Sequence, residues 1–278
     1  MNDRIYNRYL EVLNQQLDVA DSSLSCPPPT DSFITHYWRL KNSASSKNSL
    51  VNLDDYRTLT LRESRTTIQD GTTGLRTWLA SLVLSEYLID TPDLIANKRI
   101  LELGSGIGFL GIICASLQRL HQTTESAPPP HLWLTDANED VLTKCRGNVQ
   151  LPCNLSSTHP NVHHRLLDWT AFEHSASRST ALADMDALDE DIILGADIVF
   201  DPALIEPFVT VLALRLFKLR QNGPRVALIA LTVRNPDTFQ AFLDAVERAA
   251  LTVEHVDYQS SGRMFLERRK VKRTRLHR

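Results

Sequence analysis

Ile100-Leu-Glu-Leu-Gly-Ser-Gly-Ile-Gly-Phe-Leu-Gly111 is the stretch that decides the fold class of this chain. It predicts a hydrophobic strand over 99–103, then a glycine loop, then an apolar helix over 109–120. A strand, a tight glycine turn and a helix N-terminus together form a pocket for a polar cofactor. A glycine turn that only closes a strand–helix unit is the alternative at this point.

The spacing of the glycines does not choose the cofactor. Counted from Gly104, the dinucleotide fingerprint G-x-G-x-x-G fails, because its last place is Phe109. Counted from Gly106, the same fingerprint is met by Gly108 and Gly111. A dehydrogenase therefore stays open as a remote alternative.

The acid just ahead of the loop favours another cofactor. Glu102 completes the pattern E-x-G-x-G-x-G. A fixed negative charge there suits a positively charged ligand such as S-adenosylmethionine better than a pyrophosphate, because opposite charges attract. We expect Glu102 to lie near the amino acid end of that cofactor, which carries the sulfonium.

Composition bounds the class of protein. The 278 residues allow one large core with a small appendage. A hydrophobic content of 42% and a charged content of 23% are typical of soluble globular proteins, and the net charge of −3 gives no reason to expect a nucleic-acid partner. No run approaches the roughly 18 apolar residues of a membrane span, and the N-terminus lacks a signal pattern, so we expect a cytoplasmic protein. The four cysteines form no C-x-x-C pair, so neither a metal site nor a disulfide framework is predicted.

Strands and helices are expected to alternate along most of the chain. The pattern predicts an α/β fold: a seven-stranded, mostly parallel, Rossmann-like sheet with an antiparallel last strand and a helical N-terminal segment. We expect three parts, namely the helical segment at 1–57, the main domain at 58–269 and a basic tail at 270–278. The predicted strands are 58–62, 99–103, 131–135, 162–167, 191–200, 225–232, 251–258 and 263–269, and the predicted helices are 75–89, 109–120, 139–149, 203–219 and 236–249, with a polar loop from 168 to about 190.

Acids follow the second and third strands of the alternating part. In open α/β sheets the ligand lies at the carboxyl ends of the strands. Asp136 can there accept both ribose hydroxyls, although it could instead cap the next helix. Asp168 can accept from an adenine amine while Trp169 covers the ring, or the pair could be a surface acid beside a core indole.

The fourth strand ends where the reacting groups should meet. A small residue, Ala196, lets the backbone approach the cofactor, and Asp197 can point toward an incoming nucleophile. Phe200 could wall a channel for an alkyl chain. The alternative is a turn in which Asp201 caps the following helix.

Three stretches carry a resemblance to a known family. Residues 63–78, with the block Gly71-Thr-Thr-Gly-Leu-Arg-Thr-Trp78, then 100–106 and 196–200, resemble the eukaryotic elongation factor 2 lysine methyltransferases, which are seven-β-strand protein-lysine methyltransferases. The resemblance runs from about residue 58 to 267. It implies cofactor contacts at Trp78, Gly104, Ser105, Gly106, Asp136, Trp169 and Ala196, and a substrate-side motif D-x-x-Y/F at Asp197 and Phe200.

Together, these features and the resemblance predict an S-adenosylmethionine-dependent protein-lysine N-methyltransferase. The resemblance implies a lysine of translation elongation factor 2 as its substrate, and we expect a monomer. The alternatives are a methyltransferase of another protein, on lysine or histidine, or of a small molecule, and a non-catalytic binding module that retains the fold.

Overall fold

The structure is a computed structural model that describes residues 31–40, 53–64, 73–122, 130–173, 175–219, 223–259 and Phe265. The chain divides into two compact units, Met1–Thr30 and Asp31–Arg278, and all described residues belong to the second. Residues 1–30 of the helical segment expected at 1–57, the basic tail at 270–278 and residues 71–72 of the glycine–threonine block lie outside them. The limits of the three-part division stay a prediction.

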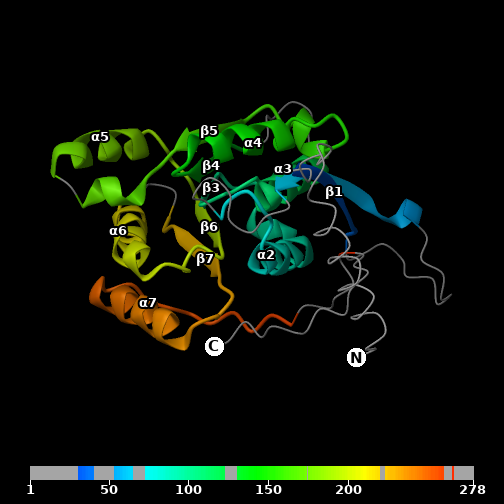
Figure 1. Cartoon of the computed structure of the whole chain (residues 1–278). Coiled ribbons are helices and arrows are strands. Elements are labelled where there is room, and N and C mark those ends of the chain that lie inside the picture. The colour runs from blue at the N-terminus through cyan, green and yellow to red at the C-terminus, as the bar shows by residue number, and fades with distance from the viewer. Residues whose placement is uncertain are drawn as a thin grey trace, which may run out of the picture. The chain divides into compact units, whose positions relative to one another are not determined.

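A five-stranded parallel sheet forms the centre of the second unit (Figure 1). Its strand order is β5-β4-β3-β6-β7. The strands are β3 (Ile100–Leu103), β4 (Leu132–Asp136), β5 (Val162–Leu166), β6 (Ile192–Ala196) and β7 (Val226–Ala230). The order reverses beside β3, so the carboxyl ends of β3, β4 and β6 meet at the switch point where open α/β sheets bind ligands.

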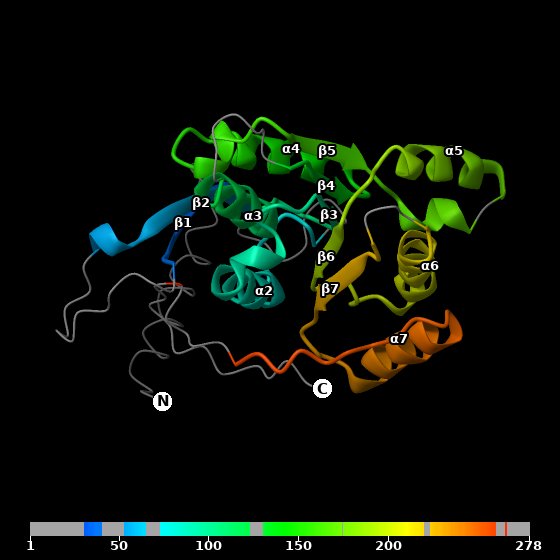
Figure 2. The same ribbon diagram turned by 180° about the vertical axis from the view of Figure 1, so that it is seen from behind.

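Helices cover both faces of this sheet (Figures 1 and 2). One face carries α2 (Leu79–Asp90), α3 (Phe109–Leu120) and α4 (Glu139–Val149), and the other carries α5 (Ser175–Asp186), α6 (Ile205–Leu216) and α7 (Pro236–Arg248). Alternate residues of the inner strands divide between two cores: Ile100 packs with the first group and Leu101 with the second. Because both faces are covered, these strands are mostly apolar, whereas the edge strand β5 is mostly polar.

Short 3-10 helices join these elements. They are η1 (Leu53–Asp55), η2 (Pro92–Leu94), η3 (Leu155–Thr158), η4 (Trp169–Phe172) and η5 (Pro202–Leu204). Local chemistry fixes where the longer helices begin. Asn138 caps α4 by accepting from the amides of Asp140 and Val141, and Asn235 caps α7.

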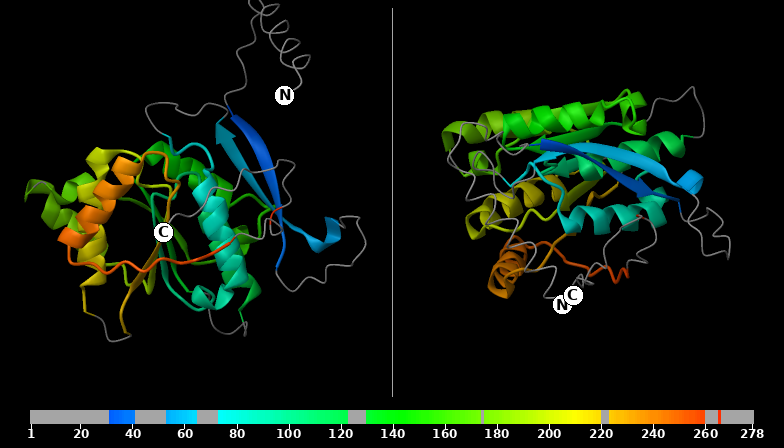
Figure 3. Two further views of the ribbon diagram at one scale, coloured as in Figure 1. Left: turned by 90° about the horizontal axis from the view of Figure 1, so that it is seen from below. Right: turned by 45° about the vertical axis from the view of Figure 1, so that its right-hand side comes forward.

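Two further strands form a separate antiparallel hairpin, β1 (Asp31–Trp38) and β2 (Arg57–Ser64). Figure 3 (left) shows it on the side of the sheet that carries α2. The α/β class and the mostly parallel sheet are confirmed, but the seven described strands belong to two sheets. The strand at 31–38 also differs from the helix expected over the N-terminal segment, because it pairs with β2 along its whole length and its last residue, Trp38, is buried in the apolar core.

Two other expectations differ from the structure. The polar loop expected from 168 to 190 contains α5, which sequence reasoning missed because its side chains are mostly small and polar. Residues 251–258 were expected to be a strand, yet they carry no strand ladder, and Val253 and Val256 are exposed. Within the expected strand 263–269 only Phe265 is described, and it forms an isolated bridge to Trp38.

No helix in the described ranges is long and apolar enough to span a membrane.

Candidate functional site

The loop after β3 is the centre of the candidate site. Gly104, Gly106 and Gly108 adopt left-handed φ values of 66°, 52° and 92°, which residues with a Cβ atom rarely adopt. The Ser105 amide and hydroxyl both donate to the Thr135 carbonyl, at 2.7 and 3.1 Å. The loop is therefore pinned to the end of β4 and turns into α3 directly after Gly108.

Other loops crowd against these glycines. A Cβ at Gly104 would stand 2.7 Å from Ile198 Cγ2, beyond β6, and 3.7 Å from the Trp169 ring, beyond β5. A Cβ at Gly106 would stand 3.0 Å from the carbonyl oxygen of Gly74. The structure thus brings the ends of β3, β5 and β6 and the glycine–threonine block to one place.

Glu102 carries a carboxyl that is buried beside the glycine loop. It is 2% exposed, and its Oε2 atom contacts no donor among the residues that the structure describes. A Cβ at Gly111 would lie 3.0 Å from that oxygen, so the missing side chain in α3 makes room for the carboxyl. Burial, and then the charge of Asp136, raise the pKa of Glu102 to about 8. An unpartnered carboxyl of this kind is a group that a cationic ligand could satisfy.

Asp136 bridges the end of β4 to the glycine loop. Its carboxylate accepts from the amides of Gly106 and Asn138, each at 3.1 Å. Burial raises its pKa despite these bonds. The cap of α4 is Asn138, so the alternative that Asp136 serves as that cap is wrong.

Asp168 and Trp169 differ in their surroundings. Asp168 is exposed and caps η4, because its Oδ1 accepts from the Thr170 amide and hydroxyl. The Trp169 ring is half-buried against Phe208, with centroids 5.1 Å apart. Its indole N–H is buried, and the described part of the chain offers it no acceptor. Of this pair, Trp169 is therefore the residue whose side chain lies against the glycine loop.

Trp78 stands at the N-terminus of α2. Its indole N–H donates to the Thr73 carbonyl at 3.1 Å, which folds the block back on itself. Thr77, next to it, donates its hydroxyl to Glu63 at 2.6 Å. The guanidinium of Arg234 lies over the Trp78 ring, 4.9 Å from its centroid.

Asp197 follows β6 in a left-handed conformation, φ 60°, and its amide donates to the Ala230 carbonyl. Its carboxylate accepts four hydrogen bonds: from the Thr232 amide at 3.0 Å, the Thr232 hydroxyl at 3.2 Å and the two terminal nitrogens of Arg234 at 3.2 and 2.7 Å. Ala196, just before it, is half-buried and pairs with Ala230 in the sheet. Asp197 is thus held by the end of β7.

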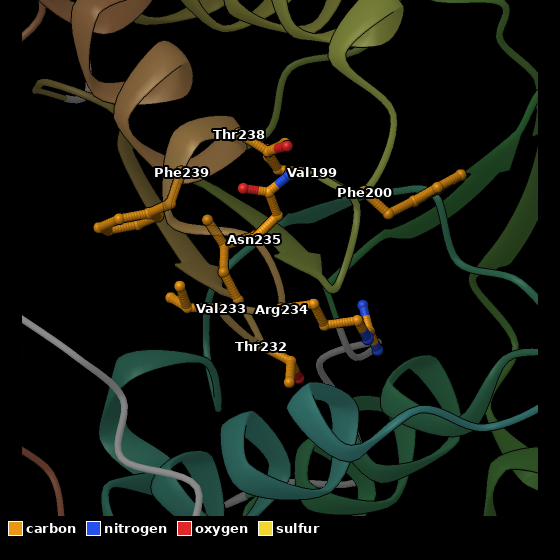
Figure 4. A pocket seen from close by; sticks show the side chains of 9 residues that line it. Val199, Phe200, Thr232, Val233, Arg234, Asn235, Thr238 and Phe239 are labelled. Carbon is orange, nitrogen blue, oxygen red and sulfur yellow. The ribbon is translucent and has the colours of Figure 1, made fainter.

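Phe200 lies on the loop beyond Asp197 and is 50% exposed. It borders a small pocket between the loops after β6 and β7 (Figure 4). The figure shows Phe200 and Phe239 on opposite sides of that pocket, with Arg234 pointing away from Phe239. The pocket is lined by Val199, Phe200, Leu231, Thr232, Val233, Arg234, Asn235, Thr238 and Phe239.

Sequence reasoning missed Arg234 and Thr232. The signal was the predicted strand 225–232, whose carboxyl end must reach the same edge as its neighbour. Four strand ends were used to assign the site, and this fifth end supplies the partners of Asp197.

No group of three or more histidine, cysteine or acidic side chains that could hold a metal ion occurs within the described ranges.

Comparison with known proteins matches residues 54–249 to a family model described as lysine methyltransferase. The chain belongs to this lysine methyltransferase family. The matched range contains every predicted site residue, from Trp78 to Phe200, and also Arg234.

Curated relatives of the lysine methyltransferase family support the assignment. The chain is 33% identical to the protein-lysine N-methyltransferase EEF2KMT of Homo sapiens over 70% of this chain and 56% of that protein. It is 32% identical to the protein-lysine N-methyltransferase EFM3 of Chaetomium thermophilum over 70% of this chain and 53% of that protein. The EFM3 protein of Saccharomyces cerevisiae is 24% identical over 65% of this chain and 50% of its own length. The chain spans about half the length of these relatives.

Proposed function

We propose that this chain is an S-adenosylmethionine-dependent protein-lysine N-methyltransferase, and that its substrate is translation elongation factor 2. The observation that carries the cofactor is the buried carboxyl of Glu102 beside a left-handed glycine loop, whose Oε2 atom has no donor within the described part of the chain. The elongation factor rests on the resemblance of residues 63–78, 100–106 and 196–200 and on relatives named as protein-lysine methyltransferases.

The residues at this edge fit the proposed cofactor. Glu102 offers a buried carboxyl, whose proton a cationic ligand would displace, and the glycine loop lies so close to neighbouring segments that side chains would not fit on it. Asp136 offers a carboxylate for the ribose hydroxyls. Trp169, with an indole N–H that lacks an acceptor in the described chain, offers an aromatic face for the adenine. We assign the cofactor to Trp78, Glu102, Gly104, Ser105, Gly106, Asp136, Asp168, Trp169 and Ala196.

The chemistry asks little of the protein beyond positioning. When bound, S-adenosylmethionine supplies a methyl group on a positively charged sulfur, which a neutral lysine amine accepts as the carbon–sulfur bond breaks. A free lysine has a pKa of about 10.4, so its deprotonation at pH 7 costs about 4.6 kcal/mol. Removing the amine from water offsets part of this cost. Orientation of the amine toward the methyl group supplies most of the rate gain.

Asp197 and Phe200 are the proposed substrate-side residues. The Asp197 carboxylate is fixed by four donors, so a lysine amine would take the place of one of them, such as the Thr232 hydroxyl at 3.2 Å. Phe200 is exposed at the border of the pocket between the loops after β6 and β7. It offers an apolar wall for the lysine alkyl chain, without the hydroxyl that tyrosine would add.

The test is incubation with methyl-labelled cofactor and purified elongation factor 2, alongside a total lysate, with mass spectrometry of the modified residue. Label on a lysine of elongation factor 2 supports the proposal. Label on a histidine, another protein or a small molecule moves the function to that substrate. Failure to bind the cofactor in calorimetry favours a non-catalytic module.

We further propose that the protein acts in the cytoplasm as a monomer. Gel filtration at working concentration and localisation of a tagged chain test these two points. A dimer in solution, or exclusion from the cytoplasm, would contradict them.

Asp197→Asn tests the substrate-side assignment. Asparagine tolerates the left-handed backbone but cannot accept from all four donors, so turnover should fall at least about tenfold while cofactor affinity changes little. The matched control is Asp201→Asn, four residues along, which makes the same chemical change at an exposed residue and keeps the oxygen that caps η5. Equal loss of cofactor affinity and turnover in Asp197→Asn would reject the assignment.

A further inference from the structure

Arg234 joins two proposed site residues that lie far apart in the sequence. Its guanidinium donates to both carboxylate oxygens of Asp197, which follows β6. The same group lies over the ring of Trp78, at the start of α2. A planar cation can hold a carboxylate in two places and stack on an aromatic face at once, which a lysine cannot do.

The two partners are unequally exposed. The Asp197 side chain is 3% exposed, whereas the Arg234 side chain is 45% exposed. A carboxylate so buried needs a compensating charge, and Arg234 is the cation that the structure places on it. Thr232 adds two neutral donors from the same strand end.

This pairing bears on the chemistry of lysine methylation. A bare carboxylate within about 4–6 Å of an amine favours the ammonium form and raises its pKa by about 1–3 units. The ammonium has no lone pair to attack with. A carboxylate already neutralised by a guanidinium attracts the ammonium less. It can accept a hydrogen bond from the amine where the amine replaces the Thr232 hydroxyl, because the four present donors already use its acceptor positions.

We infer that Arg234 is a positioning residue for the proposed reaction: it fixes the carboxylate of Asp197 against Trp78 and cancels its charge, so that the site orients the lysine amine without holding it as an ammonium ion. The inference rests on the proposed function. Other ionisable side chains at this edge of the described structure include Glu102, Asp136 and Glu63, and they remain the same in every variant below.

The first test compares Arg234→Gln with Arg234→Lys across pH. Removing the charge in Arg234→Gln should lower turnover at pH 7 about tenfold or more, and raising the pH by one to two units should recover much of the loss. Arg234→Lys keeps the charge and should keep the wild-type position of the pH profile. Arg248→Gln, which loses an exposed ion pair with Glu206, is the matched control. A loss that is equal at every pH would show a merely structural role and overturn the inference.

The second test measures binding only. Calorimetry at pH 7 compares S-adenosylhomocysteine, a neutral thioether, with an analogue whose methylsulfonium is replaced by a carbon bearing a primary amine. Arg234→Gln should bind the amine analogue about tenfold tighter, relative to the thioether, than wild type does. An unchanged ratio in a variant with a wild-type thermal melt would overturn the inference.

The binding test separates the inference from the proposed function. If wild type binds both ligands but methylates nothing, the proposed substrate fails and the binding ratio still decides the role of Arg234. If wild type binds neither ligand, the cofactor site and the inference fail together.

Discussion

At the scale of single residues, the sequence predicted which residues form the site but not their burial, hydrogen bonding or protonation. The sequence predicted that Glu102 would stand beside a glycine loop. The structure adds that Gly111 of α3 makes room for its carboxyl and that the described chain gives its Oε2 no donor. The pKa of about 8 follows from that enclosure, which no local pattern encodes.

Glu102→Gln should change how stability depends on pH. The folded chain keeps the Glu102 proton up to about pH 8, whereas the unfolded chain releases it near the ordinary value of 4.5, so wild-type stability falls as pH rises between these values. The variant lacks this loss. Urea unfolding at pH 5 and pH 8.5 should show wild type losing on the order of 4 kcal/mol more than the variant. Parallel pH dependence of the two proteins would contradict the buried proton.

Gly104→Ala should destabilise the loop. The new Cβ would stand 2.7 Å from Ile198 Cγ2 at a φ of 66°, so strain and overpacking together should cost about 2–4 kcal/mol in the free energy of unfolding. Gly147→Ala is the matched control, because a Cβ there meets nothing within 4 Å inside α4. That variant should gain about 0.5–1 kcal/mol by chemical denaturation. Equal effects of the two changes would contradict the close packing around Gly104.

At the scale of elements, buried strands and amphipathic helices were predicted well. The limits of α4 and α3 agree with the expected 139–149 and 109–120, since an asparagine cap and a left-handed glycine mark their starts. The helix α5 was missed, and residues 251–258 were wrongly expected to be a strand. The first lacks apolar periodicity. The second has alternation, but within the described part of the chain no strand pairs with it.

The hairpin of β1 and β2 is held by two buried asparagines. Asn154 accepts from the Thr60 amide and donates to the Thr60 carbonyl, each at 2.8 Å. Asn148 bonds the Arg62 backbone in the same way and also donates to the Ile107 carbonyl at the glycine loop. The hairpin is therefore tied to the elements that carry the candidate site.

Asn154→Ala should loosen the hairpin before the sheet. Leaving the Thr60 backbone groups without partners costs about 1–3 kcal/mol each, and amide hydrogen exchange should rise in β2 while β3 and β4 stay protected. Asn138→Ala is the control, since it should cost about 1 kcal/mol and expose only the first turn of α4. Faster exchange throughout the central sheet would show that the hairpin is not a separate unit of stability.

At the scale of the whole unit, the two ends of the parallel sheet have different roles, one in the candidate site and one in stability. The carboxyl ends carry the candidate site. The amino-terminal edge carries a buried ionic network in which Arg215 of α6 pairs with Glu190 at 2.5 Å and also donates to the Met185 and Leu188 carbonyls. Arg225, at the start of β7, pairs with the same glutamate at 2.9 Å.

Arg215→Met should destabilise the protein without touching the site. Glu190 is fully buried, so removal of one cation leaves its charge undercompensated at a cost of about 3–5 kcal/mol in the free energy of unfolding. Cofactor affinity of the folded protein below its melting temperature should stay at the wild-type value. Arg248→Ala, which breaks an exposed pair, should change stability by less than about 1 kcal/mol. A weakened cofactor affinity in Arg215→Met would show that the two ends are coupled.

The sequence by itself determined the α/β class, the glycine loop and the acids at the strand ends, because these depend on local periodicity, on left-handed backbone that glycine permits and on the rule that parallel strands end at one edge. Only the tertiary structure decided that Arg234 reaches Asp197 and Trp78, that Glu102 is sealed beneath α3 and that β1 pairs with β2. Those features depend on contacts between residues far apart in the chain, and such contacts arise from packing that no window of neighbouring residues contains.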